Sequence, residues 1–431
     1  MRSVLVVTAH FPPVNAADHH RIRMALNYLK EFGWKAHILT VNPNRLQNPT
    51  LEPLLEKTYP EDTSVSLVNA FPFGLTRLFG LGSLAIRSYY WFDKIGSELL
   101  KQQKFDLVFF TTTQFNLFML GVKWKHRFNV PFVVDYQDPW TSDYYETTNT
   151  PPPGGNFKYK FTQWLAKKQE PKVLKDASHI ISVSPAYPKM LMTKYSFLNS
   201  NHFTVLPFAA PNYDLSVVNS AHVMNTQYNN KSGRHWVYIG RAGDDMKFSV
   251  SALFAAIKAE RLSNSSLFEN LTLHFIGTSY DQGNKARKTV APIAEQYGIE
   301  DLVKETTHRI PYFETLKCLK DADLVLAIGS DDPSYTASKI YPYLMLERPI
   351  LAIFHQQSSV HSVLTTAGID TVAGFSETTP LALQTLIVDI RQQMVRLLQS
   401  NYSNSLKLTI ESFSARPMTE TLCRVFDSAA T

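Results

Sequence analysis

Cysteine and long apolar runs are what this sequence has least of. Only Cys318 and Cys423 occur among 431 residues, and they form neither a CxxC pair nor a zinc-binding spacing. So few thiols exclude a disulfide scaffold and predict a reducing, cytoplasmic location. No stretch approaches the roughly 20 apolar residues of a membrane-spanning helix, so we expect a protein that is soluble or peripheral at the inner face of the membrane.

Strong charge of one sign is also missing. The 43 Lys and Arg residues exceed the 37 Asp and Glu residues by a net charge of only +6. The sequence has no clustered basic face and no RNA-binding motif, which excludes nucleic acid as a partner. The adjacent histidines His19 and His20 lack further ligands, so no metal site is predicted. The small basic excess favours anionic partners such as nucleotides or phospholipid head groups.

What is present is an alternation of strand and helix patterns through both halves of the chain. Apolar strand patterns occur at 4–8, 37–41, 107–111, 131–135, 179–183, 235–239, 271–276, near 303, and at 324–328 and 349–354. Helix-length segments separate them, which predicts parallel sheets with helices on both faces. Because 431 residues exceed one ordinary core, we predict an α/β protein with two doubly wound, Rossmann-like domains facing across a cleft.

Composition indicates the domain boundaries. Residues 1–206 form the predicted N-terminal domain and residues 235–405 the predicted C-terminal domain. Between them, 207–234 is rich in Pro, Asn and Ser and has little periodicity, which predicts a connection. Residues 406–431 are expected to form a helix that packs back on the N-terminal domain. Ligands of parallel sheets bind beyond the carboxyl ends of the strands, so we look for functional residues in the loops that follow strands.

The loop after the first strand holds one candidate site. Asn15, Ala16 and Ala17 lead into a helix that is predicted to begin near Arg21. Unpaired amides at a helix start, together with a guanidinium, can hold a phosphate. The alternative is a capped surface loop in which Asp18 accepts hydrogen bonds from the helix amides.

A second candidate follows the strand at 131–135, which ends in Asp135 and Asp138 and is followed by Trp140. Asp138 can orient a substrate hydroxyl, and Trp140 can stack on a sugar ring. The alternatives are that Asp135 caps turn amides and that Trp140 packs under a loop.

In the second domain, basic side chains follow a strand exit. Gly240 lets the backbone approach a ligand closely, and Arg241 and Lys247 are near enough in sequence to reach one diphosphate together. The alternative is that both cations are solvated surface side chains.

The segment 329–343 is the most informative. Proline is tolerated only in the first turn of a helix, so Pro342 predicts a helix that begins close to Ser338, with its free amides directed at the diphosphate. The alternative is a capped core helix. The catalytic carboxylate is predicted to be Asp331 or Asp138, with Asp332 also open. The donor-binding residues predicted here are Ser330, Asp332, Thr336, Ser338, Lys339 and Tyr343.

In order and spacing these motifs resemble the family-4-like glycosyltransferases of the GT-B fold, of the glycosyl transferase group 1 type. The matching stretches are FPPxxxxxxxR, PFVVDYQDPW, DASHIISVSP, YIGR with Lys247, KDADLVLAIG and SKIYPYLMLERPILAI. The resemblance implies that Arg241 and Lys247 contact the diphosphate of a nucleotide-diphosphate-sugar. It also implies transfer of a hexose to a glycan or lipid-linked hydroxyl acceptor on the N-terminal domain, in cell-surface polysaccharide or glycolipid synthesis. Retention of configuration, no obligatory metal and no cofactor beyond the sugar-nucleotide substrate are implied as well.

The sequence departs from the family pattern at its acidic motif. The two glutamates of Glu-x7-Glu correspond to Ser334 and Pro342, so Asp331, Asp332 or Tyr343 is expected to supply the ribose contact. Two alternatives stay open as a result: a catalytically degenerate protein that binds a sugar nucleotide or a partner, and a nucleotide-sugar epimerase of the same fold.

Residues 71–92 combine many aromatic side chains with Arg77 and Arg87 and contain no acid. This composition is typical of a segment that lies in a membrane interface and admits a lipid-linked acceptor. It is equally typical of a buried helix of the first domain.

Overall fold

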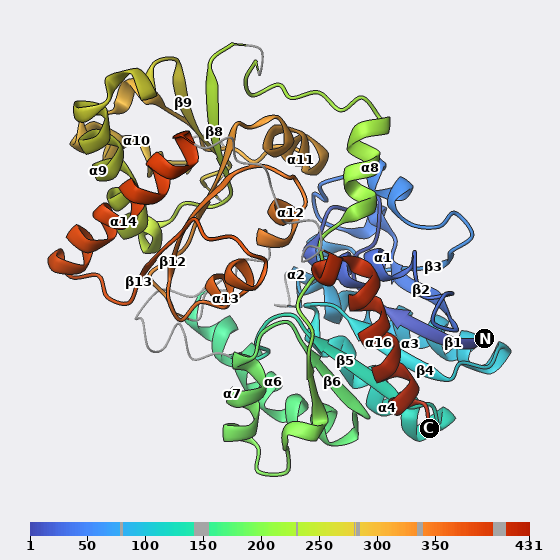
Figure 1. Cartoon of the computed structure of the whole chain (residues 1–431). Coiled ribbons are helices and arrows are strands. Elements are labelled where there is room, and N and C mark those ends of the chain that lie inside the picture. Colours follow the sequence, from blue (N-terminus) through green and yellow to red (C-terminus); the bar gives the residue numbers. More distant parts are fainter. Residues whose placement is uncertain are drawn as a thin grey trace. The chain divides into compact units, whose positions relative to one another are not determined.

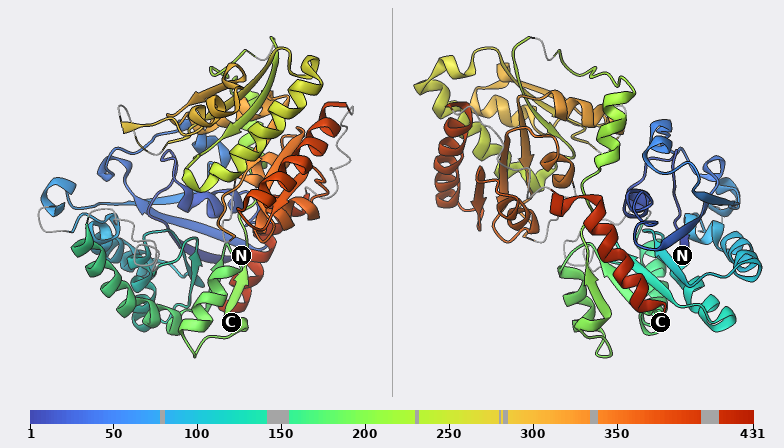
Figure 2. Two further views of the ribbon diagram at one scale, coloured as in Figure 1. Left: turned by 90° about the vertical axis from the view of Figure 1, so that its left-hand side faces the viewer. Right: turned by 45° about the vertical axis from the view of Figure 1, so that its right-hand side comes forward.

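The structure is a computed structural model, which describes residues 1–77, 81–141, 155–229, 232–279, 281, 285–333, 339–399 and 411–431. The chain divides into two compact units. Unit 1 contains 1–209 and 415–431, and unit 2 contains 210–414. Figures 1 and 2 show that each unit is built on its own sheet.

Unit 1 has a seven-stranded sheet in the order β3-β2-β1-β4-β5-β6-β7, and all of its strand pairs are parallel. From the centre of the sheet the chain winds first through β2 and β3 and then through β4 to β7, so the winding changes direction between β1 and β4. Such a switch point is where open α/β sheets bind ligands. The strands are β1 (Arg2–Val7), β2 (Trp34–Val41), β3 (Ser64–Val68), β4 (Leu107–Thr111), β5 (Phe132–Tyr136), β6 (His179–Ser182) and β7 (Phe203–Val205).

Apolar residues alternate along these strands and supply two separate cores, one on each face. Leu5 and Val7 belong to the core that α3, α4, α6 and α7 complete, while Val4 and Val6 belong to the core that α1 and α16 complete. All four of these side chains are fully buried. The helices of unit 1 are α1 (His20–Ala25), α2 (Phe73–Arg77), α3 (Leu84–Gln102), α4 (Met119–Phe128), α6 (Asn156–Asp176), α7 (Ala186–Lys194) and α16 (Ala415–Ala429).

Helix α16 is far from the rest of unit 1 in sequence, but its apolar side covers that unit's sheet. The ring of Phe426 lies 5.3 Å from Trp34 on β2 and 5.1 Å from Phe109 on β4, measured between centroids. Figures 1 and 2 show this helix in red beside the strands of unit 1.

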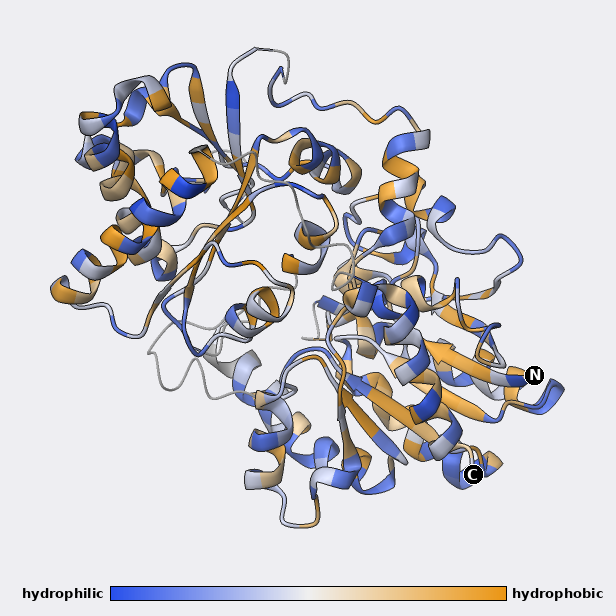
Figure 3. Cartoon of the chain, in the orientation of Figure 1, coloured by the Kyte–Doolittle hydropathy of each residue, from blue (hydrophilic) through white to orange (hydrophobic). Residues whose placement is uncertain are grey.

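Unit 2 has a six-stranded parallel sheet in the order β10-β9-β8-β11-β12-β13. It repeats the doubly wound pattern, and its switch point lies between β8 and β11. In Figure 3, β1 of the first sheet and β12 of the second are coloured mostly as hydrophobic, as expected for strands buried on two faces. The strands are β8 (Arg234–Ile239), β9 (Leu271–Ile276), β10 (Val303–Thr306), β11 (Leu324–Ile328), β12 (Ile350–His355) and β13 (Val372–Phe375).

Helices α9, α10 and α14 share the main core of unit 2 with one face of this sheet. Helix α11 packs against β8, and α13 against β12 and β13. The helices of unit 2 are α8 (Asn212–Ser220), α9 (Lys247–Ser263), α10 (Ala291–Tyr297), α11 (Tyr312–Asp321), α12 (Ile340–Leu344), α13 (Ser359–Thr366) and α14 (Pro380–Gln399).

The structure defines two of the predicted segments more closely. The predicted connection 207–234 contains α8, which contacts α11 of unit 2 because Val217 and Val218 supply a buried side to an otherwise polar stretch. The helix that was predicted to begin close to Ser338 is α12, which spans Ile340–Leu344 and keeps Pro342 within its first turn. None of the helices in the described part of the chain combines the length and apolarity needed to span a bilayer.

Candidate functional site

The switch point of unit 2 gathers most of the residues predicted to bind the donor. The loop after β8 begins at Gly240 and Arg241, and the loop after β11 contains Ser330 and Asp331. Because β8 and β11 are adjacent and parallel, both loops leave the same edge of the sheet. The backbone amide of Asp331 donates a hydrogen bond of 2.9 Å to the carbonyl oxygen of Asp245, which joins the two loops directly.

Gly240 makes room for a lysine at this edge. Its φ of 144° lies in the region that side chains rarely adopt, and a Cβ there would come within 3.0 Å of Lys339 Nζ. Glycine therefore permits the ammonium to approach the end of β8 closely. The sequence predicted a close approach at Gly240 by a ligand, whereas in the structure the neighbour is a side chain of the protein.

Lys339 is partly buried beside an aromatic ring. Its Nζ donates a hydrogen bond of 2.9 Å to the Tyr238 hydroxyl and lies 4.1 Å from the centroid of that ring. The Tyr238 hydroxyl in turn donates to the carbonyl oxygen of Arg241. Burial, and then the positive charge of Arg241, lowers the pKa of Lys339 to about 7. Among the described residues no carboxylate makes an ion pair with this ammonium, so an anion at this edge would stabilise its charged form.

Arg241 is held in a fork by a carboxylate. Its Nη1 and Nη2 each donate a hydrogen bond of 2.6 Å to one oxygen of Asp245. Partial burial favours a raised pKa for Asp245, but hydrogen bonds from Arg241 and Ser330 outweigh it and lower the pKa. Asp245 thus stays ionised and fixes the guanidinium. Sequence reasoning missed this residue, although a spacing of four residues from an arginine was a signal for the pair.

Lys247 lies at the exposed start of α9, beside a cavity of about 390 Å³ in unit 2. Arg287 and Lys288 also line this cavity, as does Asp244, so three cations and one carboxylate surround it. The sequence predicted Lys247 but missed the other two, because basic residues in an irregular loop look solvated.

The remaining predicted donor residues differ in their surroundings. Asp331 and Asp332 are exposed. Partial loss of water around the Asp331 carboxylate, and then the negative charge of Asp245, raises the pKa of Asp331. Ser330 is buried and accepts a hydrogen bond from the amide of Asp332. Tyr343 is also buried, with its hydroxyl donating to the carbonyl of Ile239 at 3.2 Å, so it ties α12 to β8. Thr336 and Ser338, with the predicted amide site at Ser338, lie outside the described residues.

In unit 1 the expected phosphate contact of Arg21 is wrong. Its guanidinium is entirely buried, with Nε donating to Asp135 at 2.8 Å and Nη2 donating to the carbonyl of Leu206 at 2.6 Å. The core, rather than a ligand, therefore uses these donors. Asp135 is equally buried and pairs with Arg21 instead of capping turn amides.

The strand end at Asp138 also differs from its functional interpretation. Trp140 is buried and stacks on Phe115, with centroids 5.7 Å apart and planes 21° apart, so it packs in the core instead of presenting a face to a sugar. Asp138 itself is exposed to solvent, although its local surroundings raise its pKa by desolvation. It remains a carboxylate at the carboxyl edge of the sheet.

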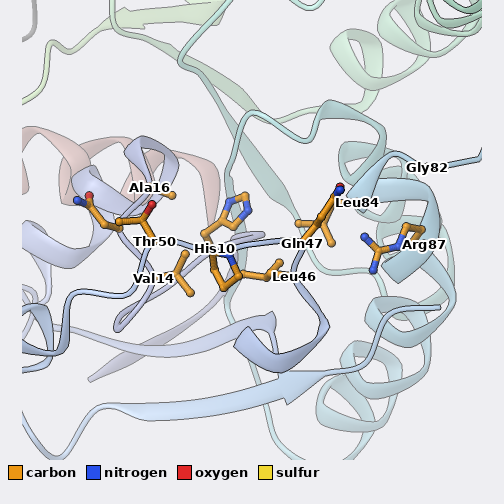
Figure 4. A pocket seen from close by; sticks show the side chains of 11 residues that line it. His10, Val14, Ala16, Leu46, Gln47, Thr50, Gly82, Leu84 and Arg87 are labelled. Carbon is orange, nitrogen blue, oxygen red and sulfur yellow. The ribbon is translucent and has the colours of Figure 1, made fainter. Parts of the chain in front are cut away.

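The loop after β1 lines a cavity of about 320 Å³ that lies within unit 1 (Figure 4). Asn15 and Ala16 are in its wall, as is His10, which sequence reasoning did not select. Ala17 begins the short helical turn behind this wall. The Asp18 carboxylate accepts from His10 and not from the helix amides that the alternative interpretation proposed.

No protein-family model matches the chain, and no curated protein sequence matches it. Solved structures do match along nearly its whole length. Anabaena Alr3699/HepE in complex with UDP and glucose is 13% identical, with a TM-score of 0.59 over 99% of this chain and 100% of that one. A glycosyltransferase from Rickettsia africae is 12% identical, with a TM-score of 0.54 over 99% and 98%.

The catalytic domain of starch synthase IV from Arabidopsis thaliana, bound to ADP and acarbose, is 10% identical, with a TM-score of 0.59 over 100% of this chain and 99% of that one. At such low identity these likenesses establish the fold. The chain has the GT-B fold, with two doubly wound α/β domains.

The depressed pKa of Lys339 gives the site a predicted pH dependence. A nucleoside-diphosphate-sugar carries no proton that titrates between pH 6 and 9. The protonation state of Lys339 therefore sets how the affinity for the donor depends on pH. An anion bound at this edge would favour the ammonium form, so its affinity should be constant below pH 7 and fall above it, by up to about tenfold per pH unit.

Calorimetric titration of the wild type and two variants measures this effect. Lys339→Arg keeps its charge and should bind with little change from pH 6 to 9, whereas Lys339→Met should bind weakly at every pH. An equally steep fall in Lys339→Arg would show that another group is responsible.

Proposed function

We propose that this protein is a glycosyltransferase that moves a sugar from a nucleoside-diphosphate-sugar to a hydroxyl acceptor. The observation that carries the proposal is the pair of cations, Arg241 and Lys339, at the switch point of unit 2, where the ammonium has no carboxylate partner in the described part of the chain. Sugar transfer creates negative charge on the departing diphosphate. Fixed cations stabilise that charge more strongly in the transition state than in the ground state.

The finer features of the reaction are also proposed. Arg241, Lys247 and Lys339 supply the positive charge that the leaving group needs, so the reaction does not require a metal. Asp331 or Asp138 is the candidate carboxylate near the sugar, and the resemblance to family-4-like enzymes supports retention of configuration. The structures that match this chain include complexes with UDP and with ADP, so UDP-sugars and ADP-sugars are the first donors to test. The acceptor is a glycan or lipid-linked hydroxyl in cell-surface polysaccharide or glycolipid synthesis.

A thermal-shift screen against UDP-, GDP-, ADP- and dTDP-sugars tests donor binding directly. A donor at about 100 times its dissociation constant should stabilise the protein by about 2.7 kcal/mol, so its melting temperature should rise by several degrees. Release of the nucleoside diphosphate in the presence of acceptor then tests transfer. No shift with any donor at millimolar concentration would contradict the proposal.

A second candidate is a protein that binds a sugar nucleotide without transferring the sugar. It is favoured by Ser334 and Pro342, which stand where the resembling family has two glutamates. A donor that produces a thermal shift but releases no nucleoside diphosphate, with a panel of glycan and lipid acceptors, would support this candidate over the transferase.

Contact with a membrane surface is also proposed for residues 71–92. In the described part of this segment Phe71, Leu75 and Leu81 are exposed, while Phe92 is fully buried in the core. We expect the intact protein to sediment with anionic vesicles and the variant Leu75→Glu/Leu81→Glu to stay in solution. Leu262→Glu, at an exposed leucine of α9, is the matched control and should behave as the wild type. Equal sedimentation of all three proteins would contradict the proposed membrane contact.

A further inference from the structure

The cavity of about 320 Å³ in unit 1 is lined by the segments that follow β1, β2 and β3, at the carboxyl edge of that unit's sheet. His10, Asn15 and Ala16 come from the loop after β1, and Leu84 and Arg87 come from the first turn of α3. The wall is fixed by backbone hydrogen bonds, since the amide of Asn15 donates to the carbonyl of Thr50 at 2.8 Å. A cavity of this size at this position is suited to a small ligand.

Arg87 brings an uncompensated charge to the cavity. It is 4% exposed, and its Nε and Nη2 each donate a hydrogen bond of 2.8 Å to a carbonyl oxygen, of Phe71 and Arg45 respectively. Among the described residues no carboxylate pairs with it, and no acidic side chain lines the cavity. Burial alone lowers its pKa. Its other neighbour is the ring of Phe73, whose centroid lies 5.6 Å from the guanidinium carbon. In the part of the chain that the structure describes, two carbonyls and an aromatic face are thus all that offset the buried charge, and an anion would stabilise it further.

Figure 4 shows the Arg87 guanidinium pointing back toward Leu84 and Gln47, in the direction of His10. The cation is therefore directed along the cavity and not away from it.

His10 contributes a second, oriented polar group. Its Nδ1 donates to both oxygens of Asp18, at 3.0 and 3.1 Å, and Asp18 also accepts from the Thr112 hydroxyl at 2.9 Å. Burial favours a lowered pKa for His10, but the Asp18 carboxylate outweighs it and raises the pKa. With Nδ1 engaged, Nε2 is the ring atom that can hydrogen-bond to a ligand hydroxyl. The buried carboxylate fixes this orientation.

We propose that this cavity binds the acceptor, and that the acceptor is a sugar or polyol that carries a phosphate ester. Arg87 holds the phosphate, and His10, with Asn15 and Thr50, holds the hydroxyls. Calling this ligand an acceptor rests on the proposed function, since only a transferase has an acceptor. Binding of the phosphate ester can be measured whether or not the protein is a transferase. The phosphate belongs either to a free metabolite or to a lipid head group.

Isothermal titration of the intact protein tests the cavity with glucose 6-phosphate, glucose and inorganic phosphate as probes. We expect glucose 6-phosphate to bind at least about tenfold more tightly than glucose, because the ester alone satisfies the buried charge. Arg87→Met should lose at least about tenfold in affinity for the ester and little for glucose. Arg127→Met, at an exposed arginine of α4, is the matched control and should bind as the wild type.

Because Arg87 also holds two carbonyls of the fold, a second variant keeps the test decisive. Ala16→Trp fills the cavity from an extended backbone position and leaves the hydrogen bonds of Arg87 intact. It should abolish binding of glucose 6-phosphate while its melting temperature stays close to that of the wild type. Binding of the ester that survives in Ala16→Trp would overturn the proposal.

Vesicles distinguish the two sources of phosphate. Sedimentation with phosphatidylglycerol vesicles, but not phosphatidylcholine vesicles, that is lost in Ala16→Trp would assign the site to a lipid head group. Binding of glucose 6-phosphate alone would assign the site to a free ester, and binding of neither ligand would overturn the proposal.

Arg241→Ala separates this proposal from the proposed function, since the variant should no longer bind the sugar nucleotide but should still bind glucose 6-phosphate. A protein that binds the ester but no nucleotide would refute the transferase and leave the cavity site standing.

Discussion

Replacing Arg241 by alanine is expected to weaken binding of the donor nucleotide by at least about 100-fold, equivalent to about 3 kcal/mol. The variant loses the positive charge of a guanidinium that Asp245 holds at the switch point of unit 2. It also leaves the carboxylate of Asp245 without its partner next to the bound anion, so repulsion adds to the lost attraction. Calorimetric titration with the donor found in the thermal-shift screen measures the change.

The chain offers a closely matched control for this variant. Arg261 makes the same two-pronged pair with Asp301, at 2.8 and 2.6 Å, on the exposed side of α9 in the same unit. Arg261→Ala should therefore bind the donor as the wild type does. In Arg241→Ala/Asp245→Ala part of the affinity should return, because the unpaired carboxylate is gone. Similar losses in the two single arginine variants would mean that Arg241 does not contact the donor.

Breaking the Arg21–Asp135 pair is expected to destabilise unit 1 by about 3–5 kcal/mol, since removal of one partner leaves the other charge buried and alone. Both side chains are fully buried, and their shortest contact is 2.8 Å. Arg21→Met removes the ion partner of the Asp135 carboxylate, and Asp135→Leu removes the ion partner of the Arg21 guanidinium. The double variant should lose clearly less than the sum of the two, because it leaves neither charge alone.

Hydrogen exchange measures this loss in the affected unit alone. Amides of β1, β4 and β5 should exchange faster in each single variant, while amides of β8 and β11 report on unit 2 as an internal reference. Lys30→Ala breaks the exposed pair with Asp62 and should leave the exchange rates of these amides close to those of the wild type. Unchanged protection in Arg21→Met would show that the pair does not stabilise the unit.

Most of the fold was predictable because buried parallel strands are continuous apolar runs. The patterns at 107–111, 271–276 and 324–328 match β4, β9 and β11 to the residue. The strands that were missed lie at or near sheet edges and are polar or short. β3 reads Ser-Val-Ser-Leu-Val and β7 has three residues, while β13 contains a glycine. Their strand conformation depends on pairing with a neighbour that only the tertiary structure supplies.

The candidate site was only partly predictable from local rules. Arg241 and Lys339 were predicted from a strand exit and from a motif, and both lie at the switch point of unit 2. Asp245 and Tyr238, which hold these cations, were not predicted: the spacing of four residues between Arg241 and Asp245 was overlooked, and Tyr238 on β8 meets Lys339 only in the folded chain. Arg21 was misjudged for the converse reason. An arginine after a strand looks like a ligand contact unless the sequence reveals the buried carboxylate more than 100 residues later.

The return of α16 to the first sheet also bears on the order in which the protein becomes complete during synthesis. The ribosome synthesises the whole of unit 2 before Phe426 is made, so the face of β2 and β4 that this ring covers stays exposed while unit 2 is translated. Domains usually finish folding in the order in which they emerge. Here unit 2 can fold before unit 1 is complete, and the sheet of unit 1 has to stay soluble with an open apolar face until α16 is available.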